Sequence, residues 1–235
     1  MLIKCELLKI KRQYHLFSIV IIGFLVVCFQ SYIGYKETSI PSSALYVTGL
    51  DIFSSLIFPV MITILVSLSF YHDVENMGIQ LFILKGISIR KIFYSKWIAY
   101  VIAMIIYFLL AFSITVFFMV LRGINIIDIF YNTFTYLIYS ILSIILLVNL
   151  SFILYGVLKN YFIPILIGVI ASIIGVINLG DWVNMLNPWA YLNNLSSTKS
   201  IGWEYFATII ISTLISCFTM LMVIKIYCES KDHES

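Results

Sequence analysis

Charged residues are scarce in this 235-residue chain: they make up 11% of it, while 62% of the residues are hydrophobic. Soluble domains average about 25% charged and about 45–50% apolar residues, so this composition excludes an ordinary soluble domain and predicts a membrane protein. The net charge of +3 is small, and we expect no nucleic-acid partner.

The motifs of nucleotide, zinc-protease and hydrolase chemistry are also missing, since G-x-x-x-x-G-K-[S/T], H-E-x-x-H and G-x-S-x-G do not occur. The four cysteines, Cys5, Cys28, Cys217 and Cys228, have neither C-x-x-C nor metal-ligand spacing. We therefore predict no catalytic residue, no metal site and no cofactor bound by this chain. A membrane enzyme would require polar side chains from different spans to meet in a buried pocket.

Long uncharged runs are what the chain does have, and runs of about 20 apolar residues can cross a bilayer. They predict an all-α polytopic membrane protein, with residues 1–235 forming one transmembrane domain. The six expected transmembrane helices are 14–33, 50–71, 97–121, 134–158, 161–180 and 204–227. Residues 122–132 are expected to be a short loop along the membrane surface.

Prolines and small residues predict details within these spans. Pro59 should bend the second span, because proline removes a backbone hydrogen bond, whereas Pro164 falls in the first turn of the fifth. Small residues at four-residue spacing, Gly168 with Ser172 and Ala171 with Gly175, predict close helix packing.

Residues 1–13 show a short amphipathic pattern. Ile3, Leu7 and Ile10 recur at helical spacing, and the basic residues around the remaining surface are Lys4, Lys9, Lys11 and Arg12. The pattern predicts a basic helix at the membrane interface. It could be a water-exposed anchor, or it could lie on the membrane and also brace a partner subunit.

Lysine and arginine divide unequally between the two sides of this topology. If the N-terminus is cytoplasmic, eleven of the 14 fall inside, and Lys36, Arg122 and Lys199 fall outside. Positively charged loops are retained in the cytoplasm, so both termini are expected inside. Residues 72–96 then form a cytoplasmic loop and residues 181–203 an extracellular segment.

The 72–96 loop mixes both signs of charge with apolar residues. Apolar residues three or four apart predict a short amphipathic helix within it. Gly86 should end this helix, and Ser88 should cap a second short helix leading into the third span. The loop could be a helical hairpin lying on the inner leaflet or a docking element for another protein.

Aromatic and polar residues supply the remaining signals. Trp97 is expected at the interface where the third span opens, and the 181–203 segment should form short helices at the headgroup level, with candidate residues Trp182, Pro188, Trp189 and Tyr191. Gln30, Asn149 and Asn178 should make hydrogen bonds between helices. The acids Asp51, Asp73, Glu75 and Glu204 fall near span ends, which argues against an ion-coupled transporter.

Several motifs carry a resemblance to a known family. They are Glu75-Asn76-x-Gly78-x-Gln80-Leu81, Gly86-Ile87-Ser88 followed by basic residues, Ser95-Lys96 before an apolar span, and Asn187-Pro188-Trp189-Ala190-Tyr191 before the last span. Together with the six-span plan and the basic N-terminus, they resemble the ABC exporter permeases of the type-2 family. The chain looks most like the lantibiotic-immunity and peptide-toxin exporter subunits. It departs from that pattern at Ile89, where a basic residue often follows the serine.

The resemblance implies a permease subunit of the bacterial cytoplasmic membrane that exports or expels antimicrobial, lantibiotic-like or other amphipathic peptides. ATP and magnesium would be bound by a separate ATP-binding cassette subunit, and a second permease would complete a homodimer or a related heterodimer. The implied ATPase-coupling residues are Glu75, Asn76, Gly78, Gln80, Leu81, Phe82, Lys85, Gly86, Ser88 and Arg90. The alternative is an ATP-independent immunity or sensor protein that binds peptides in the membrane.

Overall fold

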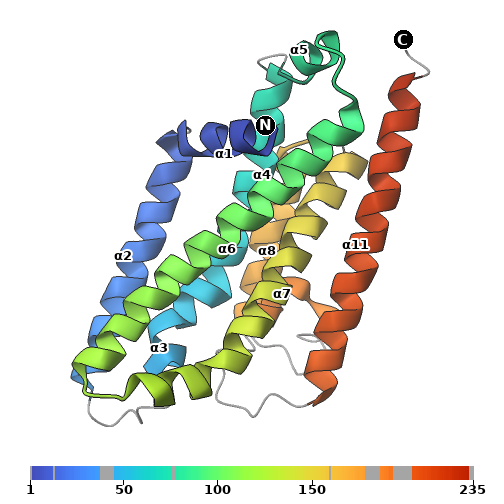
Figure 1. Cartoon of the computed structure of the whole chain (residues 1–235). Coiled ribbons are helices and arrows are strands. Elements are labelled where there is room, and N and C mark those ends of the chain that lie inside the picture. The colour runs from blue at the N-terminus through green and yellow to red at the C-terminus, as the bar shows by residue number, and fades with distance from the viewer. Residues whose placement is uncertain are drawn as a thin grey trace.

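The computed structural model describes residues 2–12, 14–37, 45–75, 78–158, 160–177, 186–192 and 203–232. Within these residues the regular elements are helices, which confirms the all-α prediction. The long helices run side by side (Figure 1): α2 (Tyr14–Lys36), α4 (Phe58–Glu75), α6 (Ile89–Leu121), α7 (Ile126–Leu158), α8 (Phe162–Ile177) and α11 (Trp203–Asp232). The shorter ones are α1 (Leu2–Arg12), α3 (Leu45–Ile52), the π-helix η2 (Phe53–Ile57), α5 (Gly78–Leu84) and the 3₁₀ helix η3 (Pro188–Ala190).

Five segments of the described chain are long and apolar enough to cross a membrane. They are Ser18–Lys36, Thr48–Asp73, Ile89–Leu121, Ile126–Leu158 and Ala207–Lys225. The shorter apolar helix α8 has 16 residues, about 24 Å at a rise of about 1.5 Å per residue, against a hydrocarbon core of about 30 Å. The chain is thus a multi-pass membrane protein, but the sixth predicted span is not confirmed.

Two helices begin well before the spans predicted from hydrophobicity. α6 starts at Ile89 rather than at residue 97, and α7 starts at Ile126 rather than at residue 134. The predicted 122–132 loop is therefore wrong from residue 126 onward, and Figure 1 shows the first turns of α7 crossing the end of the bundle. An apolar run marks the membrane-facing part of a helix and not its first residue. Polar residues interrupt the apolar run in both early segments, Arg90 and Lys91 in α6 and Asp128 in α7, although the backbone is already helical there.

The second span is interrupted where Pro59 predicted a bend. Between α3 and α4, η2 takes up a π-helical turn, closed by the backbone N–H of Phe58 donating to the Phe53 carbonyl. Proline cannot donate to the carbonyl four residues before it, and π-turns accommodate such breaks in the hydrogen-bond ladder. The break in the second span that Pro59 predicted is thus present, as a π-helical turn.

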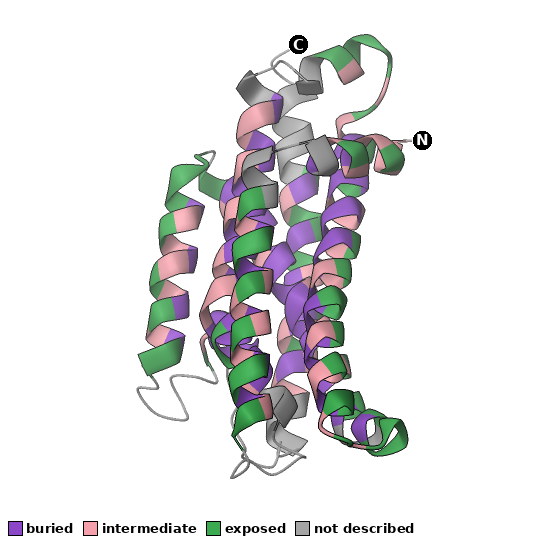
Figure 2. Cartoon of the chain, turned by 90° about the vertical axis from the view of Figure 1, so that its left-hand side faces the viewer, coloured by how far each residue is buried: buried purple, intermediate pink, exposed green. Residues whose placement is uncertain are grey.

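The second span, from Thr48 to Asp73, forms the core of the bundle. In its 18-residue apolar stretch 67% of the residues are buried, against 28% in the corresponding stretches of α2 and α11. Figure 2 shows buried residues inside and exposed ones on the outer faces. α8 packs closely against this core, because a Cβ at Gly168 would lie only 2.5 Å from Thr63 Oγ1. The predicted small-residue packing is confirmed there.

One end of the bundle gathers elements that are distant in sequence. α1 crosses this end, and α5 and the end of α11 lie at the same end (Figure 1). Ile10 of α1 is buried, and Ile3 and Leu7 pack against the main core. We call this the α5 end, and it holds most of the predicted site residues.

Candidate functional site

Gly86 terminates α5, whose last helical residue is Leu84, and this break was predicted. The Gly86 N–H donates to the Ile83 carbonyl at 2.8 Å, the Ile87 N–H donates to the Phe82 carbonyl at 3.1 Å, and Gly86 has φ of +74°. These are the two bonds of a Schellman motif, whose left-handed residue favours glycine. The sequence prediction of this break is confirmed.

The element after Gly86 differs from the prediction. Ser88 occupies the N-cap position of α6 with extended backbone, φ −64° and ψ 142°, but its side chain makes no capping hydrogen bond. The expected second short helix is instead the start of the 33-residue α6. The prediction was right about the position of Ser88 and wrong about the role of its hydroxyl.

α5 turns an apolar surface outward. Leu81 and Leu84 are 56% and 82% exposed, and Ile83 is exposed as well. The basic residues that follow, Lys85, Arg90 and Lys91, are also exposed. An exposed apolar group rimmed by charge is typical of an interaction site.

Phe82 faces the opposite way from Leu81 and Leu84. It is half-buried, and Lys9 Nζ of α1 lies 5.2 Å from the centre of its ring, within cation–π range. Among the other predicted coupling residues, Asn76 lies outside the described residues, Gly78 begins α5, and the side chains of Glu75 and Gln80 are not described.

Beneath α5, four ionisable side chains from three helices form what we call the charged cluster: Glu6 and Lys9 of α1, Asp73 of α4 and Lys96 of α6. Lys96 Nζ donates to Asp73 Oδ2 at 2.5 Å and to the Ser69 carbonyl at 2.9 Å. Lys9 Nζ donates to Asp73 Oδ1 and to Glu6 Oε1, each at 2.9 Å.

The charged cluster is largely buried and electrically balanced. Glu6, Asp73 and Lys96 are 3%, 7% and 2% exposed, and each has an oppositely charged partner. Burial alone would lower the pKa of Lys9, but its hydrogen bonds to Glu6 and Asp73 outweigh this and raise the pKa above its usual value. Lys9 therefore stays protonated at neutral pH.

This cluster corrects the prediction for α1. Lys4 is exposed as expected, but Lys9 was placed on the water-facing side and instead points into the α5 end. Lys11 and Arg12 lie in α1, and their side chains are not described. Sequence reasoning noted Asp73 at a span end and Lys96 in a family motif, but it did not place them with Glu6 in one site; the i, i+3 spacing of Glu6 and Lys9 was the available signal.

Asn149 makes the interhelical hydrogen bonds that were predicted. Its Oδ1 accepts from Trp97 Nε1 of α6 at 2.7 Å, and its Nδ2 donates to Ser216 Oγ and Cys217 Sγ of α11 at 3.0 and 3.2 Å. Trp97 therefore faces α7 from within α6. We call Trp97, Asn149, Ser216 and Cys217 the neutral hub.

The other two polar residues expected between helices are not confirmed. Gln30 has a buried Oε1 without a hydrogen-bond partner in the described chain, and Asn178 lies outside the described residues.

The predicted outer segment is described only over residues 186–192, and Trp182 lies outside this range. Pro188 begins η3. Just before it, Asn187 Nδ2 donates a hydrogen bond to the Ala171 carbonyl of α8 at 2.7 Å. Trp189 and Tyr191 are 8% and 2% exposed. A short helix is therefore present, but these two aromatic residues pack inside the bundle rather than projecting toward headgroups.

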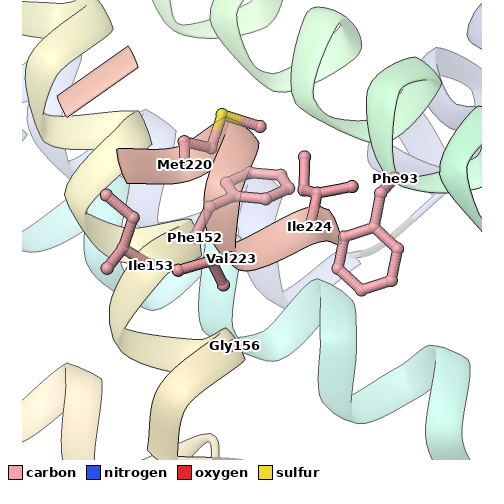
Figure 3. Close-up of a pocket in the computed structure, with 7 residues that line it drawn as sticks. All are labelled: Phe93, Phe152, Ile153, Gly156, Met220, Val223 and Ile224. Carbon is pink, nitrogen blue, oxygen red and sulfur yellow. The ribbon is translucent and has the colours of Figure 1, made fainter. Parts of the chain in front are cut away.

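A pocket lies where α6, α7 and α11 meet (Figure 3). It is lined by apolar side chains and one glycine: Phe93, Phe152, Ile153, Gly156, Met220, Val223 and Ile224. Such a lining offers apolar contacts and no acid or base. Cys5, Cys28 and Cys217 are free thiols.

These features define a class: a multi-pass helical membrane protein with an exposed apolar helix at one end, linked by charged contacts to the helices that cross the bundle. A family model described as "ABC-2 family transporter protein" matches residues 2–175. The chain belongs to the ABC-2 transporter family. This makes it a membrane permease subunit of an ABC transporter and implies an ATP-binding cassette partner. No curated protein matches the chain.

Proposed function

We propose that this permease exports or expels amphipathic, lantibiotic-like antimicrobial peptides from the bacterial cytoplasmic membrane, driven by a separate subunit that binds ATP and magnesium. α5 is the coupling helix that seats in a groove on that subunit. Membership of the ABC-2 family and the exposed surface of α5 support this assignment.

The observation that carries the docking proposal is the exposure of Leu84, at 82%, beside Leu81. Burying one leucine side chain is worth about 1.5–3 kcal/mol, so a groove that covers both would bind α5 firmly. Residues 81–91 hold three basic residues and no acid. The groove should therefore be apolar with acidic residues at its rim.

The arrangement of the ends supports a cytoplasmic location for α5. The beginning of α1 and the end of α11 lie at the α5 end, as an even number of crossings requires (Figure 1). With eleven of the 14 basic residues assigned to this side, we place both termini in the cytoplasm. In this topology α8 is the sixth crossing, and two permeases, identical or related, pair in the membrane.

The apolar character of the spans supports a peptide that enters from the bilayer. The outer surfaces of α2 and α11 expose apolar side chains such as Leu25, Phe29, Leu214 and Phe218. An amphipathic peptide already partitioned into the membrane can slide along such walls without a charged path.

The docking proposal is tested by charging the exposed face of α5. We expect Leu81→Asp/Leu84→Asp to lose the co-purifying ATP-binding subunit and to sensitise expressing cells to a lantibiotic. Ile127→Asp is the matched control, since Ile127 is 75% exposed at the start of α7. Unchanged pairing in the double variant would refute the docking role.

The ATP-independent immunity or sensor protein makes a different prediction. If the permease only binds peptides, an ATP-binding subunit with an inactivated ATPase should leave cells fully protected. If the permease is driven by ATP, the same inactivation should abolish protection while the complex still assembles.

A further inference from the structure

Lys9 joins three helices at one point. Its Nζ lies 2.9 Å from Asp73 Oδ1 of α4 and 5.2 Å from the ring centre of Phe82 of α5, while its own helix is α1. Asp73 in turn accepts from Lys96 of α6. A continuous series of contacts therefore runs from α5, through α1, to the two helices that α5 connects.

The charges of this series divide into two neutral pairs. α1 supplies Glu6 with Lys9, and the bundle supplies Asp73 with Lys96. If α1 moved away, Lys96 would keep both Asp73 and the Ser69 carbonyl. Breaking a buried ion pair is usually costly because it leaves a buried charge without its counterion. Movement of α1 would leave no buried charge in that state.

Separating α4 from α6 has the opposite consequence. Lys96 is 2% exposed and would lose Asp73. α1, which is held otherwise by Ile3, Leu7 and Ile10, is therefore the element that can dock and undock at the α5 end with little electrostatic penalty.

The two sides of α5 fit this arrangement. Leu81 and Leu84 face outward, where a partner can reach them, and Phe82 faces Lys9. A displacement of α5 by its partner must shift the ring that lies against Lys9.

We propose that α1 is a charge-balanced clip that transmits the movement of α5 to α4 and α6, with Lys9 as its positioning residue. The clip consists of Glu6 and Lys9 on α1, and its contacts are Phe82, Asp73 and, through Asp73, Lys96. This inference rests on the proposed docking of an ATP-binding subunit on α5.

Native Cys5 provides the probe, because it is a free, half-buried thiol next to Glu6 on α1. The permease and its ATP-binding subunit are reconstituted in nanodiscs, and the rate of Cys5 modification by a charged maleimide is followed by peptide-resolved mass spectrometry. We expect a non-hydrolysable ATP analogue with magnesium to change this rate by about fivefold, the lower end of ordinary allosteric coupling. A purely structural brace would give the same rate in both states.

Variants of α1 separate the clip from the docking face. Glu6→Gln/Lys9→Met should keep α1 docked through its apolar side but abolish the nucleotide dependence, whereas Lys9→Arg should retain the dependence. Lys9→Met alone should label faster than the double variant, because it leaves the buried Glu6 without its lysine.

Three results would overturn the clip: a nucleotide-independent rate in the wild-type complex, a nucleotide dependence that survives in the double variant, or a double variant that labels faster than Lys9→Met. Retention of the ATP-binding subunit is measured on the same samples. Loss of that subunit from the wild type would refute the proposed docking itself, so the two failures are distinguishable.

Discussion

Lys96 and Trp97 are neighbours on α6, yet they belong to two different polar sites. Lys96 joins the charged cluster with α1 and α4, and Trp97 joins the neutral hub with α7 and α11. The two sites lie on different sides of one helix at nearly the same height, so their surroundings can be compared directly.

The difference lies in what each site needs to remain stable. A buried charge requires its counterion, whereas an amide can exchange one hydrogen-bond partner for another at a smaller penalty. The charged cluster includes Lys9, whose side chain is 36% exposed, and it can admit the movement of a surface helix. The neutral hub holds α6, α7 and α11 together without an ionised group, so we expect it to be the fixed side of the bundle.

We expect the largest loss of stability from a substitution of Asp73 in the charged cluster. Asp73→Ala leaves Lys96 buried without a carboxylate, and we expect the free energy of unfolding to fall by about 3–5 kcal/mol. The measurement is an unfolding titration of the purified permease in mixed micelles.

Two variants control this experiment. Asp128→Ala removes an exposed acid from α7 and should change stability by less than about 0.5 kcal/mol. Asp73→Ala/Lys96→Met should recover most of the loss, because no unpaired charge remains. An Asp73→Ala effect no larger than that of Asp128→Ala would contradict our account of the cluster.

The neutral hub should respond more weakly to the same treatment. Asn149→Leu removes the hydrogen bonds to Trp97 and Ser216, and we expect a loss of about 1–2 kcal/mol. Ser113→Ala, which removes a bond within one turn of α6, is the control. If Asn149→Leu proved more damaging than Asp73→Ala, the order of the two sites would be reversed.

The stability contributions of the two sites should also differ in their dependence on alkaline pH, and this effect is smaller than those of the substitutions above. Because the pKa of Lys9 is raised, its contribution is fully present below the ordinary value of 10.5 and is lost as the pH rises through the raised value. The stability difference between the wild type and Glu6→Gln/Lys9→Met should shrink over that range, by at most about 1 kcal/mol, since Lys9 is partly exposed. The loss caused by Asn149→Leu should stay constant, and a matching pH dependence there would count against the distinction.

The smallest expected effect is the coupling between the two sites. Glu6→Gln/Lys9→Met and Asn149→Leu alter residues with no shared partner among the contacts described above. Their stability effects should add to within about 0.5 kcal/mol in a double-mutant cycle. A larger coupling would mean that α6 transmits strain from one side to the other.

Local features were predictable because they depend on a few consecutive residues. The break at Gly86 and the irregularity at Pro59 follow from backbone properties of glycine and proline, and both were located correctly. The predicted third and fourth spans begin later than α6 and α7, because hydrophobicity reports on membrane contact and not on where a helix begins.

The charged cluster was not predicted because its members are far apart in sequence. Asp73 and Lys96 are separated by 23 positions, and Lys9 lies 64 positions before Asp73. Each was placed near a membrane surface by the positive-inside pattern or its position at a span end. That information says which end of a helix a residue occupies but not which neighbour it faces.

Composition and spacing alone determined that this chain is a helical membrane protein, and local motifs pointed to the ABC-2 family and to α5 as a docking element. Only the packing of helices decided that Lys9 and Lys96 share Asp73, that Trp97 turns to Asn149, and that Trp189 and Tyr191 are buried. The reason is that helical periodicity specifies which residues share a surface of one helix. The partner of that surface depends on how all the helices fill space together.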